Sequence, residues 1–484
     1  AVVADLAILA TSAIVADLAI LATSDVVTDM NVLATADVVN DMNVLGTSAN
    51  VSAMNTLGTS ANVTAMSTAA SNITGINAFS AQYRVSGSAP SSSLDVGLGA
   101  NAVDSITTGD NNVGLGVNAG TAITTGSANV VIGVNSLDAN TTGSNNISIG
   151  TSALGVNTTA SNNTAVGNDA LGANTTGHSN VALGALALVA NTTGTLNTAS
   201  GLSALQANTT GASNSALGVN ALATNSTGGN NVAIGYQSLL LNTTASNNTA
   251  VGNASLKANT TASYQTAVGF ESGKATTTGN RNVFLGYQSG LDNTTGAQNT
   301  FVGERSGENN TTANYNTAVG SVALQANTTG ARNTAVGSSA LLANTTGNYN
   351  TASGFDTLKA NTTGTGNVAI GRDSLMTNTT ASNNTAVGYA SLQLNTTGYH
   401  NTAVGKSALE DNTTGYYNAA FGYHALKLNT TGLQNSAFGY EALYSNTSGN
   451  YNIALGITAL GANTTGDNNV GIGKLALTNN TTAS

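Results

Sequence analysis

Side chains that could carry out acid–base or metal chemistry are few in this sequence and form no recurring cluster. The 484-residue chain has three histidines and no cysteine, so ligands for a histidine or thiolate metal site are scarce. Acidic residues outside the N-terminal segment are scattered, and no Asp-x-Asp motif recurs as repeated calcium sites would require. We therefore predict no catalytic residue, no metal site and no cofactor, and we expect that the protein is not an enzyme.

Aromatic side chains, in contrast, recur in register with a 17-residue period. A first aromatic column holds Tyr236, Phe270, Tyr287, Phe355, Tyr389, Tyr423 and Tyr440. A second aromatic column, a few residues before the next repeat, holds Tyr264, Tyr315, Tyr349, Tyr399, Tyr416, Tyr417 and Tyr451. Aligned, exposed rings could stack on sugar faces or on another apolar partner, and we predict the first column as a ligand-binding stripe. The alternative is that the rings stack across repeats at the rim, with their hydroxyls in water.

Both columns belong to a repeat that a glycine marks. This glycine column recurs at every seventeenth residue from Gly99 to Gly473, without insertion or deletion, and includes Gly167 and Gly184. The other columns keep the same register, and the consensus is N-T-A-V-G-x-x-A-L-x-x-N-T-T-G-x-x. A repeat that tolerates no change of length is typical of units stacked in register on one another.

The repeat predicts a mostly β protein, a parallel β-solenoid (β-roll) of 17-residue coils over residues 99–484. T-A-V alternates as a short strand does, and N-T-T-G is typical of a turn. With coils about 4.8 Å apart, the 23 repeats predict a rod of about 110 Å. We expect the Val and Leu columns to fill a narrow core. Because a 17-residue coil is small for one chain, we predict a homotrimer that buries these columns better.

Two asparagine columns are predicted to hold the coils together. The first, seven residues after the glycine, includes Asn174, Asn191 and Asn208, and the second, four residues before it, includes Asn163, Asn180 and Asn197. Identical asparagines stacked at strand spacing can hydrogen-bond into a ladder, or can cap turn backbone groups. The glycine column marks places where one backbone approaches the next.

Three successive coils depart from the consensus. Gly273, Gly290 and Gly307 replace the leucine, and charged residues are locally dense. The missing leucines predict a thinner core, which favours either a bend or flexible joint, or neutral drift in a tolerant repeat.

The N-terminal part has a different period. Residues 1–76 repeat at every twelfth position, with Asp5 and Asp17 in one column and Val3 and Val15 in another. We interpret this segment as an elongated, trimeric stalk, helical by propensity, although alternation also permits strands. Residues 77–98, which hold the only proline (Pro90), are predicted to be a linker or junction.

The overall charge excludes some partners. There are 11 Lys and Arg against 21 Asp and Glu, so a nucleic-acid surface is not expected. No apolar run reaches the roughly 18 residues of a membrane span, and we expect no membrane insertion. Charged residues are only 7% of the chain, which agrees with stacking, because a charged column would oppose like charges in every coil.

The repeats resemble those of two fibrous families. The N-T-A-V-G and N-V-A-I-G strands resemble the S-V-A-I-G strands of trimeric autotransporter adhesin heads, which are trimeric β-rolls with a shorter coil. The whole chain resembles tail-fibre proteins of marine bacteriophages, in the T-A-V-G-x-x-A-L-x-x-N-T-T-G array and in the segments at 25–57 and 83–95. The resemblance implies a structural fibre on a virion appendage or extracellular surface. It also implies attachment to a host cell-surface glycan or protein, and contact of the N-terminus with other virion or fibre proteins.

Two alternatives stay open. A cellular adhesin or self-assembling extracellular filament would share the architecture, and an ice- or glycan-binding solenoid would also carry arrayed threonines. The Thr pairs fall at a predicted corner, whereas ice binding needs a flat face. Because the array stops without a polar cap and the chain begins at Ala1, we expect a fragment of a longer protein, or a partner that caps the array.

Overall fold

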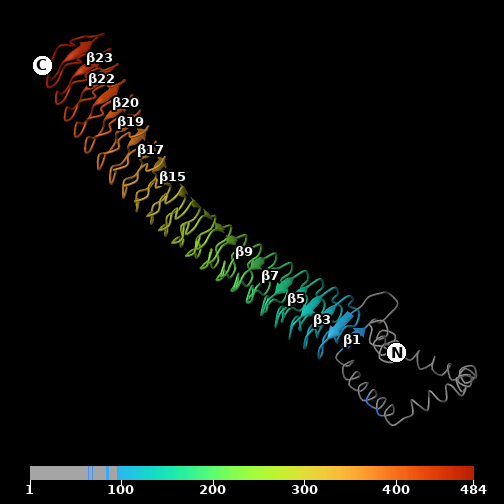
Figure 1. The fold of residues 1–484 in the computed structure, drawn as a ribbon. Coiled ribbons are helices and arrows are strands. Elements are labelled where there is room, and N and C mark those ends of the chain that lie inside the picture. The colour runs from blue at the N-terminus through green and yellow to red at the C-terminus, as the bar shows by residue number, and fades with distance from the viewer. Residues whose placement is uncertain (1–63, 65–67, 69–82, 87–94) are drawn as a thin grey trace, which may run out of the picture. The chain divides into compact units, whose positions relative to one another are not determined.

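The structure is a computed structural model that describes residues 64, 68, 83–86 and 95–484. The chain divides into two units, residues 1–81 and 82–484. The second unit is a stack of coils that forms a gently bent rod (Figure 1). The predicted stalk lies outside the described residues except at Thr64 and Thr68, which are helical and joined by a hydrogen bond from the Thr68 hydroxyl to the Thr64 carbonyl (2.8 Å).

The second unit is built from one sheet. Its strands in the first half are β1 Tyr83–Ser86, β2 Asp95–Leu98, β3 Val113–Leu115, β4 Val130–Ile132, β5 Ile147–Ile149, β6 Thr164–Val166, β7 Val181–Leu183, β8 Thr198–Ser200, β9 Ser215–Leu217, β10 Val232–Ile234, β11 Thr249–Val251 and β12 Thr266–Val268. Those in the second half are β13 Val283–Leu285, β14 Thr300–Val302, β15 Thr317–Val319, β16 Thr334–Val336, β17 Thr351–Ser353, β18 Val368–Ile370, β19 Thr385–Val387, β20 Thr402–Val404, β21 Ala419–Phe421, β22 Ser436–Phe438, β23 Ile453–Leu455 and β24 Val470–Ile472.

The register of these strands confirms the parallel β-solenoid. β10 and β11 pair in parallel with Ala233 opposite Ala250, one 17-residue coil further along the chain, and the same shift relates every neighbouring pair from β2 to β24. Of the strands in the described residues, only β1 is antiparallel, against β2. β2 lies in the segment predicted as a linker, so the row of parallel strands includes residues 95–98. Among the described residues, no helix is both long and apolar enough to cross a membrane.

Each strand points its middle residue into the coil. In β6, Ala165 is fully buried, whereas Thr164 and Val166 are half-buried on the outer side. The same alternation leaves Leu183 41% exposed. The prediction that the Val column fills the core is therefore wrong: alternate residues of a strand face opposite sides, and the narrow coil has room for alanine inside.

The leucine column, four residues after the glycine, does fill the core. Leu171 and Leu188 are fully buried, and both have φ of 53°, in the left-handed region. This conformation costs about 1–2 kcal/mol for a non-glycine residue, but it turns the chain sharply enough to place the leucine inside. Burying a leucine contributes about 1.5–3 kcal/mol, which offsets the strain. A single chain thus buries its leucines without a second copy.

The three variant coils are filled rather than thinned. Phe284 and Phe301 occupy the middle positions of β13 and β14, where alanine is usual, and both rings are fully buried. A Cβ added at Gly273 or Gly290 would collide with the Phe284 ring, and one at Gly307 with Phe301. Two phenylalanines therefore take up the volume of the missing leucines, and the prediction of a thinner core there is wrong.

Candidate functional site: stacked columns of the solenoid

The first asparagine column forms a ladder of hydrogen bonds inside the rod. The Asn174 side-chain amide donates to the Asn157 Oδ1 (2.8 Å) and to the Gly177 carbonyl of its own turn (2.9 Å). Asn191 donates in the same way to Asn174, and Asn208 to Asn191, each at 2.8 Å. These asparagines are 0% exposed. Each buried amide is thus satisfied by the coil before it and by its own turn.

The second asparagine column closes the coil. The Asn163 Oδ1 accepts a hydrogen bond from the Asn180 backbone N–H (2.9 Å), and the Asn180 Oδ1 accepts one from the Asn197 backbone N–H (3.0 Å). The Asn163 side-chain amide donates to the Gly177 carbonyl (3.0 Å). Asn174 donates to the same carbonyl. The two columns therefore meet at one turn carbonyl per coil, which ties the strand to the N-T-T-G turn.

The glycine column lies where two backbones meet. Gly167 has φ of 137°, and a Cβ there would lie 2.5 Å from both the carbonyl carbon and oxygen of Gly184. Gly184 has φ of 136° and meets Gly201 in the same way. Both the backbone conformation and the close approach exclude a side chain, which accounts for the invariance of the column.

The first asparagine ladder is interrupted at one coil. Thr276 stands where asparagine is expected, and the buried Oδ1 of Asn259, one coil before it, has no hydrogen-bond partner. The Asn293 amide, one coil after it, keeps its hydrogen bond to the Gly296 carbonyl (3.0 Å), but toward the preceding coil it donates to the Thr276 hydroxyl at 3.4 Å. In the same coil Gln265 replaces the asparagine of the second column, and its longer side chain donates to the Gly279 carbonyl. Both asparagine columns are thus substituted in the same coil, by Gln265 and by Thr276.

The rings of the first aromatic column all lie on the surface but do not form one stripe. The seven side chains are 37–50% exposed. Phe270 stacks on Tyr287 with ring centroids 5.5 Å apart, and Tyr423 stacks on Tyr440 at 5.2 Å. Tyr236 has no aromatic neighbour among the described residues. The column therefore divides into a single ring, a stacked pair and a longer C-terminal group.

Two cations complete the C-terminal group. The Arg372 guanidinium lies 5.7 Å from the Phe355 ring centroid and 5.9 Å from that of Tyr389. The Lys406 ammonium lies 5.8 Å from the Tyr389 ring and 5.6 Å from that of Tyr423. We call this row, which also includes Tyr440, the cation–ring ladder. The sequence analysis did not include these two cations in the column, although each stands 17 residues from a ring on either side.

The cation–ring ladder limits what its rings can bind. Tyr389 has Arg372 in the preceding coil and Lys406 in the following one, so both faces of its ring are covered. Its exposed surface is the ring edge and hydroxyl rather than a face on which a sugar could stack. Each cation–ring contact at such an exposed site contributes about 0.5–1 kcal/mol. The Arg372 guanidinium is paired with the Asp373 carboxylate at 3.1 Å. The ladder therefore presents hydroxyls, ring edges and the Lys406 ammonium to a ligand.

The second aromatic column also stacks across coils. Tyr399 stacks on Tyr416, and His400 stacks on Tyr417, each with ring centroids 4.9 Å apart. The Arg332 guanidinium lies 5.4 Å from the ring centroids of both Tyr315 and Tyr349. His400 is thus part of a ring stack.

His424 packs beside the cation–ring ladder. Its ring centroid lies 3.7 Å from the Tyr423 ring centroid, and its Nδ1 is 3.9 Å from the Glu441 carboxylate. Burial lowers the pKa of His424, and the positive charge of Lys427 lowers it further, while Glu441 opposes the shift. The neutral imidazole is therefore favoured in the folded rod.

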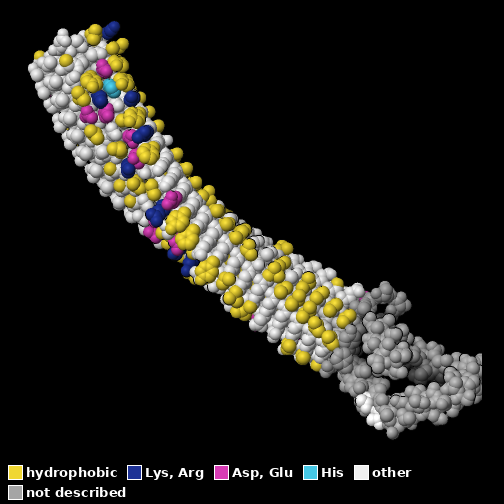
Figure 2. Space-filling model, in the orientation of Figure 1, with side chains coloured by type: hydrophobic (Ala, Val, Ile, Leu, Met, Phe, Trp, Pro, Cys, Tyr) yellow, Lys and Arg dark blue, Asp and Glu magenta, His cyan; other side chains and the backbone are white. Residues whose placement is uncertain are grey.

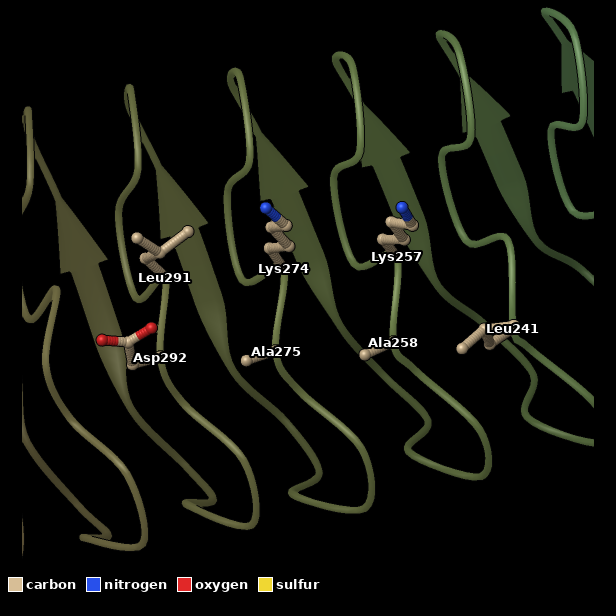
Figure 3. Close-up of a pocket in the computed structure, with 7 residues that line it drawn as sticks. All are labelled: Leu241, Lys257, Ala258, Lys274, Ala275, Leu291 and Asp292. Carbon is tan, nitrogen blue, oxygen red and sulfur yellow. The ribbon is translucent and has the colours of Figure 1, made fainter.

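A shallow groove of about 330 Å³ crosses neighbouring coils in the middle of the rod. Figure 3 shows its lining residues, among which the small side chains of Ala258 and Ala275 lie beside the long side chains of Lys257 and Lys274. Lys274 is paired with Glu271 at 2.6 Å. Asp292 lies at one end, where burial and then the charge of Glu308 raise its pKa.

No cluster of three or more His, Asp or Glu side chains suited to a metal ion occurs among the described residues. No known protein family matches the chain, and no curated protein matches it in sequence. The architecture and the surface columns therefore carry the functional argument.

Proposed function

We propose that this protein is a structural fibre whose solenoid acts as a shaft. The observation that carries the proposal is the unbroken 17-residue register from β2 to β24. Every coil is joined to the next by backbone pairing and by buried side-chain amides, so load along the axis is shared by many hydrogen bonds. The work of such a rod is reach and attachment rather than chemistry.

The proposed setting is a bacteriophage tail fibre, on a virion appendage or extracellular surface. The likeness of the repeat and of segments 25–57 and 83–95 to marine phage fibres supports it. In this setting the N-terminal part contacts other virion or fibre proteins. A cellular adhesin or extracellular filament is the alternative setting for the same rod.

Electron microscopy with an antibody against the solenoid tests the setting. Gold label on rods that project from virions is the expected result. Label on cell surfaces or on free filaments would instead support the alternative. Rods of about 110 Å for residues 95–484 are expected in either case.

We further propose that the cation–ring ladder contacts the host-surface glycan or protein. Its rings are exposed, and Lys406 adds positive charge to the same row, where Arg372 is paired with Asp373. Because both faces of the Tyr389 ring are covered, contact through its hydroxyl and the Lys406 ammonium to an acidic sugar fits this part of the ladder better than face stacking.

The receptor proposal is tested with labelled rods on a glycan array. Substituting Tyr389, Tyr423 and Tyr440 by alanine is expected to abolish binding while the circular dichroism spectrum is unchanged. Leu241→Ala, at an exposed position in another column, serves as control. Equal binding by the triple variant and the control would contradict the proposal.

The homotrimer predicted from the sequence stays a prediction. Because one chain already buries its leucine column, a trimer would have to be held by surfaces that are exposed in the single chain.

A further inference from the structure

One surface of the solenoid carries no charge along its whole length. The first and third residues of β3 to β24 point outward, and all are Val, Ile, Leu, Phe, Thr, Ser or Ala. We call these two columns the strand face. Other surface columns do carry charges, such as Arg372 just after the glycine and Lys274 beyond it. Figure 2 shows charged side chains gathered in the C-terminal half of the rod. The strand face lacks them there as well.

The third-residue column of the strand face is apolar except at Ser200 and Ser353, and several of its side chains are exposed. The first-residue column is Thr or Ser in 12 of the 22 strands. Leu217 is 52% exposed, Ile370 43% and Leu455 49%. Figure 1 shows the strands aligned in one row along the rod. A row of about 105 Å by about 10 Å, from strand spacing and strand length, offers about 1,000 Å². Stable partners bury about 800 Å² each, so the footprint of the strand face is large enough for a partner of that size.

The occupant of this face must match its period. A partner that touches every coil has to repeat at the same spacing of about 4.8 Å over the same length. A second copy of this chain does so by construction. The absence of charge also means that two such faces meet without like-charge repulsion in any coil.

We propose that the strand face packs against the strand face of other copies of this chain, sheet on sheet. Side chains of the two outward columns interdigitate as in a β-sandwich, with the sheets about 10 Å apart. This goes beyond the shaft function, which a single rod could also perform, so failure of the proposal would leave that function intact.

Charge substitution tests the face. The variant Val268→Lys, Val319→Lys, Ile370→Lys places three positive charges on it, three coils apart, at positions 37–43% exposed. The matched control is Leu196→Lys, Leu241→Lys, Leu394→Lys, at exposed apolar positions of other columns. By sedimentation velocity, wild type and control are expected to associate, and the face variant to sediment as one chain. Unchanged circular dichroism shows that each variant is folded.

Two results of this experiment would overturn the proposal. One is a face variant that keeps the mass of the wild type. The other is a wild-type rod that is monomeric at about 10 µM, the concentration at which interfaces of this size are well populated; a monomeric rod that shapes ice crystals would assign the face to ice instead.

Cysteine crosslinking gives a second test, since the chain has no cysteine of its own. Leu183 in β7 and Val387 in β19 lie on the strand face, each sixth from one end of the row β2–β24. Copies packed in parallel crosslink Leu183→Cys to itself, whereas antiparallel copies crosslink it only to Val387→Cys. Either pattern supports the proposal. No crosslink, or equal crosslinking of the off-face control Leu241→Cys, would overturn it.

Discussion

At the residue scale, stability depends on buried asparagine amides that hydrogen-bond to the asparagine of the neighbouring coil and to a turn carbonyl of their own coil. In the first asparagine column a side chain such as Asn344 donates to one neighbouring coil and accepts from the other, so a substitution there affects two coils at once. The asparagines of the N-T-T-G turns are fully buried and hydrogen-bonded, which gives the repeated N-T-T sequence a structural reason. The second threonine of each turn, such as Thr346, is exposed and contributes less to stability.

Asn344→Ala is predicted to lower the free energy of unfolding by about 2–5 kcal/mol. The change leaves the Asn327 Oδ1 without its donor and the Asn361 amide without its Oδ1 acceptor, and each buried unpaired group costs about 1–3 kcal/mol. Urea denaturation followed by circular dichroism measures the loss. Thr346→Ala, at an exposed position of the same turn, should change stability by less than about 0.5 kcal/mol.

Repairing the interrupted ladder is predicted to stabilise the rod. In the double variant Gln265→Asn, Thr276→Asn, the side-chain amide introduced by the second substitution can reach the unpaired Asn259 Oδ1. A gain of about 1–3 kcal/mol is expected from satisfying that acceptor. Thr276→Asn alone should gain less, because Gln265 already fills part of the space. An unchanged or lower urea midpoint for the double variant would contradict this account.

The pH response of His424 has a defined sign. Because burial lowers its pKa in the folded rod, folding favours the neutral ring, and the stability that this contributes is lost as pH falls below the ordinary value near 6.5. NMR titration, assigned with His424→Gln, should give a pKa below 6.5. In that variant the fall in melting temperature between pH 7 and pH 5 should be smaller. A measured pKa at or above the ordinary value would contradict the prediction.

At the element scale, each coil is a fixed volume that strand and turn fill together. The usual filling is an alanine in the strand and a leucine after the glycine, as with Ala165 and Leu171. Phe301 with Gly307 is a second solution for the same space. Coils can thus exchange core residues in pairs while the backbone path is kept.

This pairing predicts a strong coupling between Phe301 and Gly307. Gly307→Leu alone overfills the coil and should cost about 1–3 kcal/mol, and Phe301→Ala alone leaves a cavity that costs about 3–5 kcal/mol. The double variant restores the usual Ala and Leu filling, and its stability should be within about 1 kcal/mol of wild type. A double-mutant cycle in urea measures the coupling. Additive losses would show that the two sites are independent.

At the scale of the whole molecule, the rod behaves as a one-dimensional array in which each coil contacts its neighbours. Length can therefore change in whole coils. Deleting residues 300–384, which make up five 17-residue coils, joins Asn299 to Thr385 in register and should shorten the rod by about 24 Å. Small-angle scattering measures the length, and the melting curve of the shortened rod is expected to show a single transition.

Deleting 300–383 instead leaves one extra residue at the junction. The strand there has an unmatched residue, so side chains exchange faces locally and the ladders break. A lower melting temperature than that of the in-register deletion is expected. Equal melting temperatures would show that the register is not what holds the coils.

Much of the architecture could be predicted because residues 17 positions apart in the sequence are also neighbours in adjacent coils of the rod. Once Gly167 and Gly184 are aligned, every column is a stack, and the strand at T-A-V follows from its alternation. The same reasoning found both asparagine columns and the aromatic columns. It left out the cations that enter the stacks, because Arg372 and Lys406 stand at the 17-residue spacing of the rings but a column defined by aromatic residues alone does not include them.

The sequence by itself determined the period, the register and the residues that stack on themselves, because these depend only on the repeat. The tertiary structure alone decided how one coil closes. It turned Val166 outward and Ala165 inward, and placed Leu171 in the core through a left-handed residue. These features depend on contacts between different columns within a coil, which the repeat period does not specify.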